Sequence, residues 1–120
     1  MAILDITDEN FRQTYTNNEI VVLDFWAPWC GPCHQYAPVY EAVSELFPNI
    51  IFGKVNTEEE QKLAQYFGVK SIPTTIILRQ ELELVRTPGV MTENELQQII
   101  TQVKNADMEE VKKQIEAEES

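Results

Sequence analysis

The spacing of apolar positions changes several times along the chain, and each change marks a predicted element. Residues 20–26 are apolar apart from Asp24, a pattern typical of a strand that is buried on both faces. From Cys33 to about Phe47, apolar residues recur at steps of three and four, which predicts a helix. Pro38 lies inside this helical pattern, and we expect a kink there because proline has no amide proton to donate.

Further strands are predicted for residues 50–55, 74–78 and 82–85, and the last two are close enough in sequence to form a hairpin. The connecting Arg79-Gln80-Glu81 lacks the Asn-Gly or Asp-Gly pair typical of tight hairpin turns, which leaves the register of this hairpin open. Together with the helices, and with a first strand for which no bounds are predicted, these strands give the order βαβαβαββα. This order favours an α/β domain in which a mixed sheet lies between helices.

Capping residues bound three more helices, which we expect over residues 7–15, 58–67 and 92–103. The first begins at Thr7 or Asp8, two residue types that favour helix N-termini. The second ends at Gly68, which suits a left-handed closing position. The third begins at Thr92, and Glu95 three residues later completes a capping box.

The length of 120 residues suits one domain, which we assign to residues 1–106. Residues 107–120 form an acidic extension with six acidic residues and two lysines. Met108, Val111 and Ile115 lie at helical spacing within it. The extension is therefore either a solvated, helical or fraying segment, or a face for docking or self-association.

Charge and hydropathy restrict the partners and the compartment. The net charge of −11 argues against nucleic acids and anionic membranes as partners, because both attract Lys and Arg. The longest apolar run, residues 20–23, is far shorter than the ~20 residues of a membrane span. The N-terminal residues lack the basic and apolar regions of a secretory signal, so we expect a cytoplasmic protein.

Two cysteines, Cys30 and Cys33, lie where the buried strand ends and the next helix begins, in the sequence Trp29-Cys30-Gly31-Pro32-Cys33. The N–H groups and dipole of a helix N-terminus stabilise a thiolate, so Cys30 is the predicted nucleophile in disulfide exchange. Cys33 lies about one turn further on the same face and is placed to resolve a mixed disulfide. Gly31 leaves space for a partner chain, and Pro32 suits the first helical turn.

Three other interpretations of the cysteine pair are weaker. A zinc site needs about four ligands, whereas the chain has two cysteines and a single histidine, His34. An inert disulfide would close a very small loop and would stabilise the fold little. Chance placement of the pair at a strand-to-helix junction is the third. Redox chemistry is favoured over all three.

Residues 24–33 resemble the active-site segment of the thioredoxin family, and the resemblance extends from about Asp5 to Val103. Four further motifs carry it: Pro38, Lys54-Val55-Asn56, Ser71-Ile72-Pro73-Thr74 and Gly89. The resemblance implies a thioredoxin fold, here with a C-terminal helical extension, and a monomeric protein disulfide reductase. It implies no bound cofactor, since the dithiol holds the two electrons. The implied partners are thioredoxin reductase, as electron donor, and disulfide-containing target proteins.

Asp24 and Lys54 are the candidate proton-transfer residues. Burial of a lone carboxylate should raise the pKa of Asp24. The resemblance implies that Asp24 moves the proton of Cys33, and the alternative is a carboxylate bonded to nearby backbone. Lys54, on the neighbouring strand, is either a partner of Asp24 or a surface lysine.

The resemblance also implies a surface for the substrate. Pro73 would follow a cis peptide bond and face the cysteines, and the backbone of Ile72 would pair with an extended substrate segment. Trp26 would pack beneath the site, unless it simply fills the core. The implied apolar landing surface comprises Trp29, Gly31, Pro32, Ile72, Pro73 and Gly89.

The chain departs from the family pattern at His34, where many relatives have Lys or Arg, and we expect thiolate support there to be either weaker or pH-dependent. Two other functions compete with a reductase. One is an oxidase or isomerase of the same fold, and the other is a redox-gated binding module without turnover. The Gly31-Pro32 pair between the cysteines is typical of reducing family members and favours the reductase.

Overall fold

Five strands form one mixed sheet in the order β1-β3-β2-β4-β5. The computed structural model describes residues 3–119, and the strands are β1 (Leu4–Asp5), β2 (Ile20–Trp26), β3 (Ile51–Asn56), β4 (Thr74–Arg79) and β5 (Leu82–Pro88). β1, β3 and β2 run parallel to one another, whereas β4 and β5 are antiparallel to their neighbours. β2 is therefore the central strand, and its predicted bounds are confirmed.

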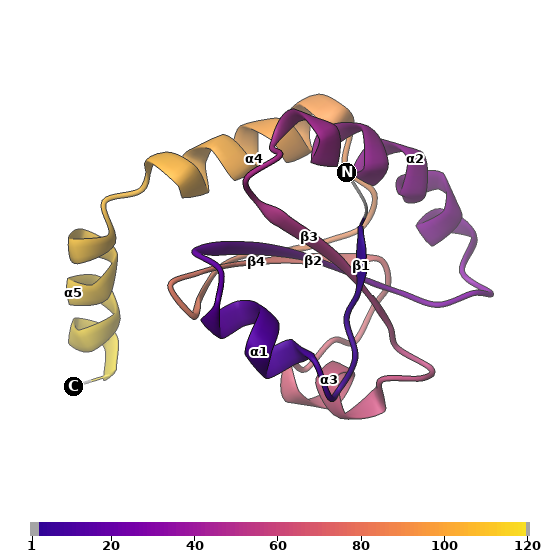
Figure 1. Cartoon of the computed structure of the whole chain (residues 1–120), viewed down its shortest axis with the longest axis horizontal. Coiled ribbons are helices and arrows are strands. Elements are labelled where there is room, and N and C mark those ends of the chain that lie inside the picture. The colour runs from indigo at the N-terminus through magenta and orange to yellow at the C-terminus, as the bar shows by residue number, and fades with distance from the viewer. Residues whose placement is uncertain (1–2, 120) are drawn as a thin grey trace.

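Helices cover both faces of the sheet (Figure 1). They are α1 (Phe11–Thr16), α2 (Gly31–Leu46), α3 (Gln61–Tyr66), α4 (Glu93–Asn105) and α5 (Met108–Glu119). α2 and α4 lie on one face, and α1 and α3 lie on the other. The predicted α/β architecture is confirmed, and so is a helix in the acidic extension.

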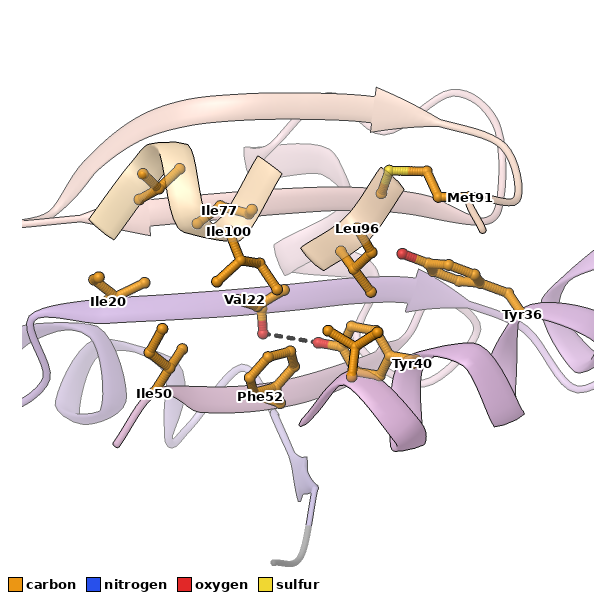
Figure 2. Close-up of a cluster of buried hydrophobic side chains, with 12 residues drawn as sticks. Ile20, Val22, Tyr36, Tyr40, Ile50, Phe52, Ile77, Met91, Leu96 and Ile100 are labelled. Carbon is orange, nitrogen blue, oxygen red and sulfur yellow. Dashed lines mark hydrogen bonds between the residues drawn. The ribbon is translucent and has the colours of Figure 1, made fainter. Parts of the chain in front are cut away.

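Alternation along β2 divides the core into two clusters. Ile20 and Val22 point toward α2 and α4, where they pack with Tyr40 and Phe52 (Figure 2). The intervening residues Val21, Leu23 and Phe25 belong to the cluster on the α1 and α3 face. Asp24 lies two residues after Val22, so its side chain points to the same face of the sheet as those of Ile20 and Val22. It therefore enters the core on the face that α2 covers.

Three predicted helix starts are wrong. α1 begins at Phe11 rather than at residue 7 or 8, because the side chains of Thr7 and Asn10 accept each other's backbone N–H and form a turn instead. Asp8 caps a different helix: its carboxylate accepts the N–H of Leu63 in α3. α3 itself begins at Gln61 instead of residue 58, and α2 begins at Gly31 instead of Cys33.

Other local predictions are confirmed. The capping box between Thr92 and Glu95 is present at the start of α4, with both reciprocal bonds formed. Gly68 has a φ of 63°, in the left-handed region. The hairpin turn also has positive φ values, 51° at Gln80 and 68° at Glu81, so two non-glycine residues adopt the backbone of a two-residue turn. Glu19 supports this turn, since its carbonyl accepts the N–H of Gln80.

Arg79 joins the end of β4 to the end of α4. Its Nη1 donates to the carbonyl oxygens of Val103, Lys104 and Ala106 at 2.8, 3.1 and 3.0 Å. Its Nε forms an ion pair with Glu19 at 2.9 Å. A cation at a helix C-terminus satisfies carbonyls that have no partner within the helix and complements the helix dipole. Arg79 thus fixes the end of α4, from which α5 departs.

Candidate active site

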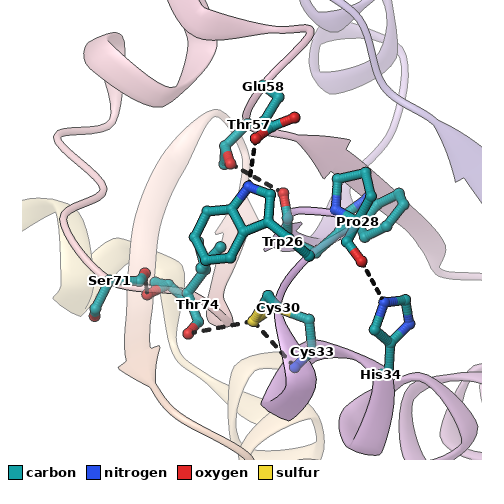
Figure 3. The surroundings of a disulfide bond; sticks show 11 residues. Trp26, Pro28, Cys30, Cys33, His34, Thr57, Glu58, Ser71 and Thr74 are labelled. Carbon is teal, nitrogen blue, oxygen red and sulfur yellow. Dashed lines mark hydrogen bonds between the residues drawn. A yellow bond between two sulfur atoms is a disulfide. The ribbon is translucent and has the colours of Figure 1, made fainter.

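The two cysteines form a disulfide at the N-terminus of α2. Cys30 is the N-cap residue, with extended backbone angles of φ −88° and ψ 109°. Its Sγ accepts the backbone N–H of Cys33 at 3.2 Å (Figure 3). Both cysteines are buried, and their Cα atoms lie 5.3 Å apart. The first sulfur therefore receives a helix N-terminal hydrogen bond, as the sequence predicts.

The loop before β4 lies against the first sulfur. The Ile72–Pro73 peptide bond is cis, as the resemblance implies. The carbonyl oxygen of Ile72 lies 3.8 Å from the Sγ of Cys30. Gly89, with a φ of 91°, donates its N–H to the carbonyl of Pro73 at 2.8 Å, which ties the end of β5 to this loop. Segments distant in sequence thus meet at the disulfide.

Asp24 is fully buried, and within residues 3–119 neither of its carboxylate oxygens has a hydrogen-bond partner. The alternative in which this carboxylate bonds to nearby backbone is therefore wrong. Burial raises the pKa of Asp24 from an ordinary 3.8 to about 7, and the charge of Lys54 offsets part of that effect. A carboxyl group with this pKa exchanges its proton near neutral pH.

Lys54 lies opposite Asp24 in the parallel register of β2 and β3. No ion pair links the two among the described residues, and the Nζ of Lys54 lies 4.8 Å from the centroid of the Trp26 ring instead. The ammonium thus stacks on an aromatic face while acting on Asp24 at longer range. Trp26 packs against the cluster of Ala27, Cys30 and Cys33, next to the disulfide.

The outer surface of the site is open. Trp29 is 68% exposed, and its indole N–H is hydrogen-bonded to the carboxylate of Glu58. Pro32 is exposed, and a Cβ added at Gly31 would meet nothing within 4 Å. Of the other predicted surface residues, Ile72 and Gly89 are half-buried and Pro73 is buried.

His34 is anchored at the entrance to α2. Its Nε2 lies 2.6 Å from the carbonyl oxygen of Pro28 and is the donor, because a carbonyl oxygen only accepts (Figure 3). The ring therefore holds the segment before Cys30 against the first turn of α2. Sequence reasoning singled out His34 for its charge and missed this bond, which depends on the fold of the loop.

Two further polar contacts near the disulfide were not predicted. Glu58 bonds to Trp29, and the hydroxyl of Tyr36 lies 2.8 Å from that of Thr75. Thr74 and Thr75 both begin β4, and the sequence does not indicate which of them contacts Tyr36. Within residues 3–119, no group of three or more His, Cys, Asp or Glu side chains is placed to hold a metal, and no helix is long and apolar enough to cross a membrane.

Comparisons with known proteins agree with this geometry. A family model described as Thioredoxin matches residues 2–102. A putative thioredoxin 2 from Streptomyces coelicolor is 47% identical over 114 residues, which cover 95% of this chain and 85% of the relative. Thioredoxin from Bacillus subtilis is 37% identical and covers 83% and 96%. The crystal structure of Malassezia sympodialis thioredoxin superposes with a TM-score of 0.77 at 32% identity, over 84% and 90% of the two chains.

A mixed sheet with helices on both faces, and a Cys-x-x-Cys disulfide at the N-terminus of a helix, define a thiol–disulfide oxidoreductase. Within that class, the family match across most of the chain identifies the lineage: the chain belongs to the thioredoxin family. Thioredoxins need no bound cofactor, because the disulfide itself takes up and gives back the two electrons.

Proposed function

We propose that the protein reduces disulfide bonds in target proteins, with Cys30 as the attacking and Cys33 as the resolving residue. One observation carries the assignment: the Sγ of Cys30 caps α2 and accepts the N–H of Cys33. That hydrogen bond and the helix dipole favour the thiolate of Cys30 over its thiol. Cys33 lies within the first turn of α2, and its sulfur accepts no such backbone N–H among the hydrogen bonds of the described residues.

The exchange proceeds in two steps that balance in atoms and electrons. The Cys30 thiolate attacks one sulfur of the target disulfide, forming a Cys30–target bond and releasing the other target sulfur as a thiolate, which takes a proton. The Cys33 thiol then loses its proton, attacks the Sγ of Cys30 and releases the second target sulfur. The second target sulfur leaves as a thiolate and also takes a proton. The target thus gains two electrons and two protons, one proton from solvent and one released by Cys33, and the protein is left with the Cys30–Cys33 disulfide.

Asp24 is the proposed acceptor of the proton from Cys33. Its pKa of about 7 lets it hold the proton or release it near neutral pH, and its own oxygens have no competing partner within residues 3–119. Lys54 is the proposed modulator, since its charge favours the ionised form of Asp24. The Trp26 ring keeps that charge close to the site without direct contact.

The proposed landing surface for targets surrounds the Cys30 sulfur. The carbonyl oxygen of Ile72 lies next to this sulfur, and the backbone of Ile72 offers a hydrogen-bond acceptor to an extended target segment. The open space at Gly31 accommodates an approaching chain. The remaining members are Trp29, Pro32, Pro73 and Gly89. Because this surface is largely apolar, we expect broad target tolerance rather than recognition of one sequence.

A thioredoxin reductase is the proposed electron donor, since each turnover leaves the Cys30–Cys33 disulfide that must be reduced again. A reducing compartment, the cytoplasm, suits this cycle. We further propose a monomer in which residues 1–106 form the catalytic domain and residues 107–120 an extension. Ala106 supports this boundary, because it ends α4 and separates that helix from α5.

Reduction of insulin by dithiothreitol tests the proposal. Catalytic amounts of the protein should accelerate insulin precipitation, and Cys30→Ser should abolish the acceleration. Cys33→Ser should also lose turnover, and when it is mixed with insulin in the absence of dithiothreitol it should form a stable mixed disulfide. A folded protein that accelerates nothing, and whose Cys33→Ser variant keeps a partner without covalent trapping, would instead be a redox-gated binding module.

A further inference from the structure

Two buried hydroxyl groups lie beside Asp24. Thr75 pairs with Asp24 in the antiparallel register of β2 and β4, and directly opposed residues of such a pair project from the same face. Tyr36 reaches this face from α2, and its hydroxyl lies 2.8 Å from the Oγ1 of Thr75. Asp24, Thr75 and Tyr36 are all 0% exposed. No water-exposed side chain therefore belongs to this group.

One hydroxyl proton in this group has no hydrogen-bond acceptor among the described residues. Two hydroxyls carry two protons, and the Tyr36–Thr75 bond uses one of them. The second has no acceptor among the hydrogen bonds of the described residues, while the two Asp24 oxygens beside it have no donor. Buried polar groups are nearly always paired, because an unpaired group loses its hydrogen bonds to water without replacement. An unused donor and an unused acceptor on the same face complement each other.

The other groups around Asp24 do not supply this donor. Lys54 from β3 directs its ammonium to Trp26. Tyr40 from α2 directs its hydroxyl proton to the carbonyl of Val22 at 2.9 Å (Figure 2) and to that of Gly53 at 2.7 Å. The residues of α4 in the same cluster are apolar, namely Leu96, Ile100 and Val103. The thiols of Cys30 and Cys33 are joined in the disulfide.

We propose that Thr75 and Tyr36 are positioning residues for proton transfer: Thr75 donates to the Asp24 carboxylate when it ionises, and Tyr36 donates to Thr75. A chain of hydroxyls that ends on a carboxylate forms a charge-assisted bond, and each member polarises the next. Because the Asp24 oxygens have no hydrogen-bond partner among the described residues of the oxidised structure, forming this bond requires a shift of the Thr75 side chain toward Asp24 as well as rotation of the two hydroxyl groups. The hydroxyl pair thereby stabilises the ionised form of Asp24, so that the group accepts the Cys33 proton more readily. This inference rests on the proposed function for its role in catalysis.

Titration of Asp24 by carbon-13 NMR tests the inference on the oxidised full-length protein, in which the cysteines do not titrate. Thr75→Val keeps the shape of the side chain and removes the hydroxyl, so it should raise the pKa of Asp24 by about one, the effect of losing one hydrogen bond to a charge. Tyr36→Phe should raise it in the same direction by less. The double variant should resemble Thr75→Val, because Tyr36 acts through Thr75.

Tyr40→Phe is the matched control, since it removes a buried phenol hydroxyl from the same helix whose proton already binds backbone carbonyls. It should leave the pKa of Asp24 unchanged. Equal shifts in Tyr36→Phe and Tyr40→Phe, or no shift in Thr75→Val, would overturn the inference. If Thr75→Val does not fold, the inference is tested by comparing the pKa of Asp24 in Tyr36→Phe with that in Tyr40→Phe.

A second readout separates this inference from the proposed function. In single-turnover reduction of a target disulfide, the pH at which Cys33 resolution reaches half its maximal rate should rise in Thr75→Val together with the pKa of Asp24. If the protein reduces insulin but Thr75→Val does not raise the pKa of Asp24, the inference about the hydroxyl pair is wrong and the proposed reductase function stands. A pKa change in a protein that reduces no disulfide would support the pair and contradict the proposed reductase.

Discussion

Replacing Asp24 with asparagine should remove most of the pH dependence that this residue gives to stability. The folded protein holds the Asp24 proton with a pKa of about 7, whereas an exposed aspartate has an ordinary value of 3.8. A folded state that binds a proton more tightly than the unfolded chain is most stable at low pH. Its stability declines as the pH rises from the unfolded value to the folded one, because folding then requires either a bound proton or a buried charge.

The magnitude follows from the two pKa values. Each pH unit inside that window costs about 1.4 kcal/mol of the free energy of unfolding. Between about pH 4.5 and about pH 8.5, the contribution of Asp24 therefore falls by about 3 kcal/mol. The amide side chain of the Asp24→Asn variant carries no charge at any of these pH values. As the pH rises across this range, the free energy of unfolding of Asp24→Asn should therefore increase by that amount relative to that of the wild type.

Guanidinium chloride unfolding of the oxidised protein, followed by circular dichroism across this pH range, measures the difference directly. The low-pH end serves as the internal control, because wild-type Asp24 is protonated there and nearly isosteric with the amide. Other titrating groups act equally on both proteins and cancel. A difference that stays constant with pH to within about 0.5 kcal/mol would refute the raised pKa and, with it, the assignment of Asp24 as proton acceptor.

Three further changes test the scaffold. Arg79→Met removes the cation that binds the last carbonyls of α4 and should lower the free energy of unfolding by about 2 kcal/mol, whereas Arg12→Met, at an exposed position, should change it by less than about 0.5. Equal effects in denaturant unfolding would contradict the role of Arg79. Thr92→Ala breaks the capping box and should cost about 1 kcal/mol in the same assay; a neutral result would mean that water replaces the cap. A chain that ends after Ala106 should keep its reductase activity in the insulin assay but melt at a lower temperature, since it loses the buried Met108; lost activity would contradict the domain boundary.

Segments in which local and tertiary preferences agree were predicted closely. The apolar run of β2 has the predicted bounds, because a strand buried on both faces has an unmistakable composition. The capping box at Thr92 lies as predicted, because both partners are three residues apart in sequence. The cysteine pair at the junction of β2 and α2 follows from the same local signals.

The errors occur where a side chain bonds to a distant segment. Asp8 has the composition of a helix cap but caps α3, which begins 53 residues later at Gln61. β1 has only two residues, too few for a periodic pattern. Within the site, the stacking of Lys54 on Trp26 and the pairing of Tyr36 with Thr75 depend on the register of the sheet and the packing of α2. Neither contact has a signature in a single sequence.

The central claim is that Cys30 attacks and Cys33 resolves, and covalent trapping tests it most directly. Each single serine variant, fully reduced, is mixed with oxidised insulin, quenched with acid and analysed by intact-mass spectrometry. We predict that Cys33→Ser accumulates a disulfide between Cys30 and an insulin chain. Cys30→Ser should accumulate almost none, because its remaining thiol lacks the helix N-terminal hydrogen bond that the Cys30 sulfur accepts. Equal trapping by both variants, or trapping through Cys33 alone, would contradict the account.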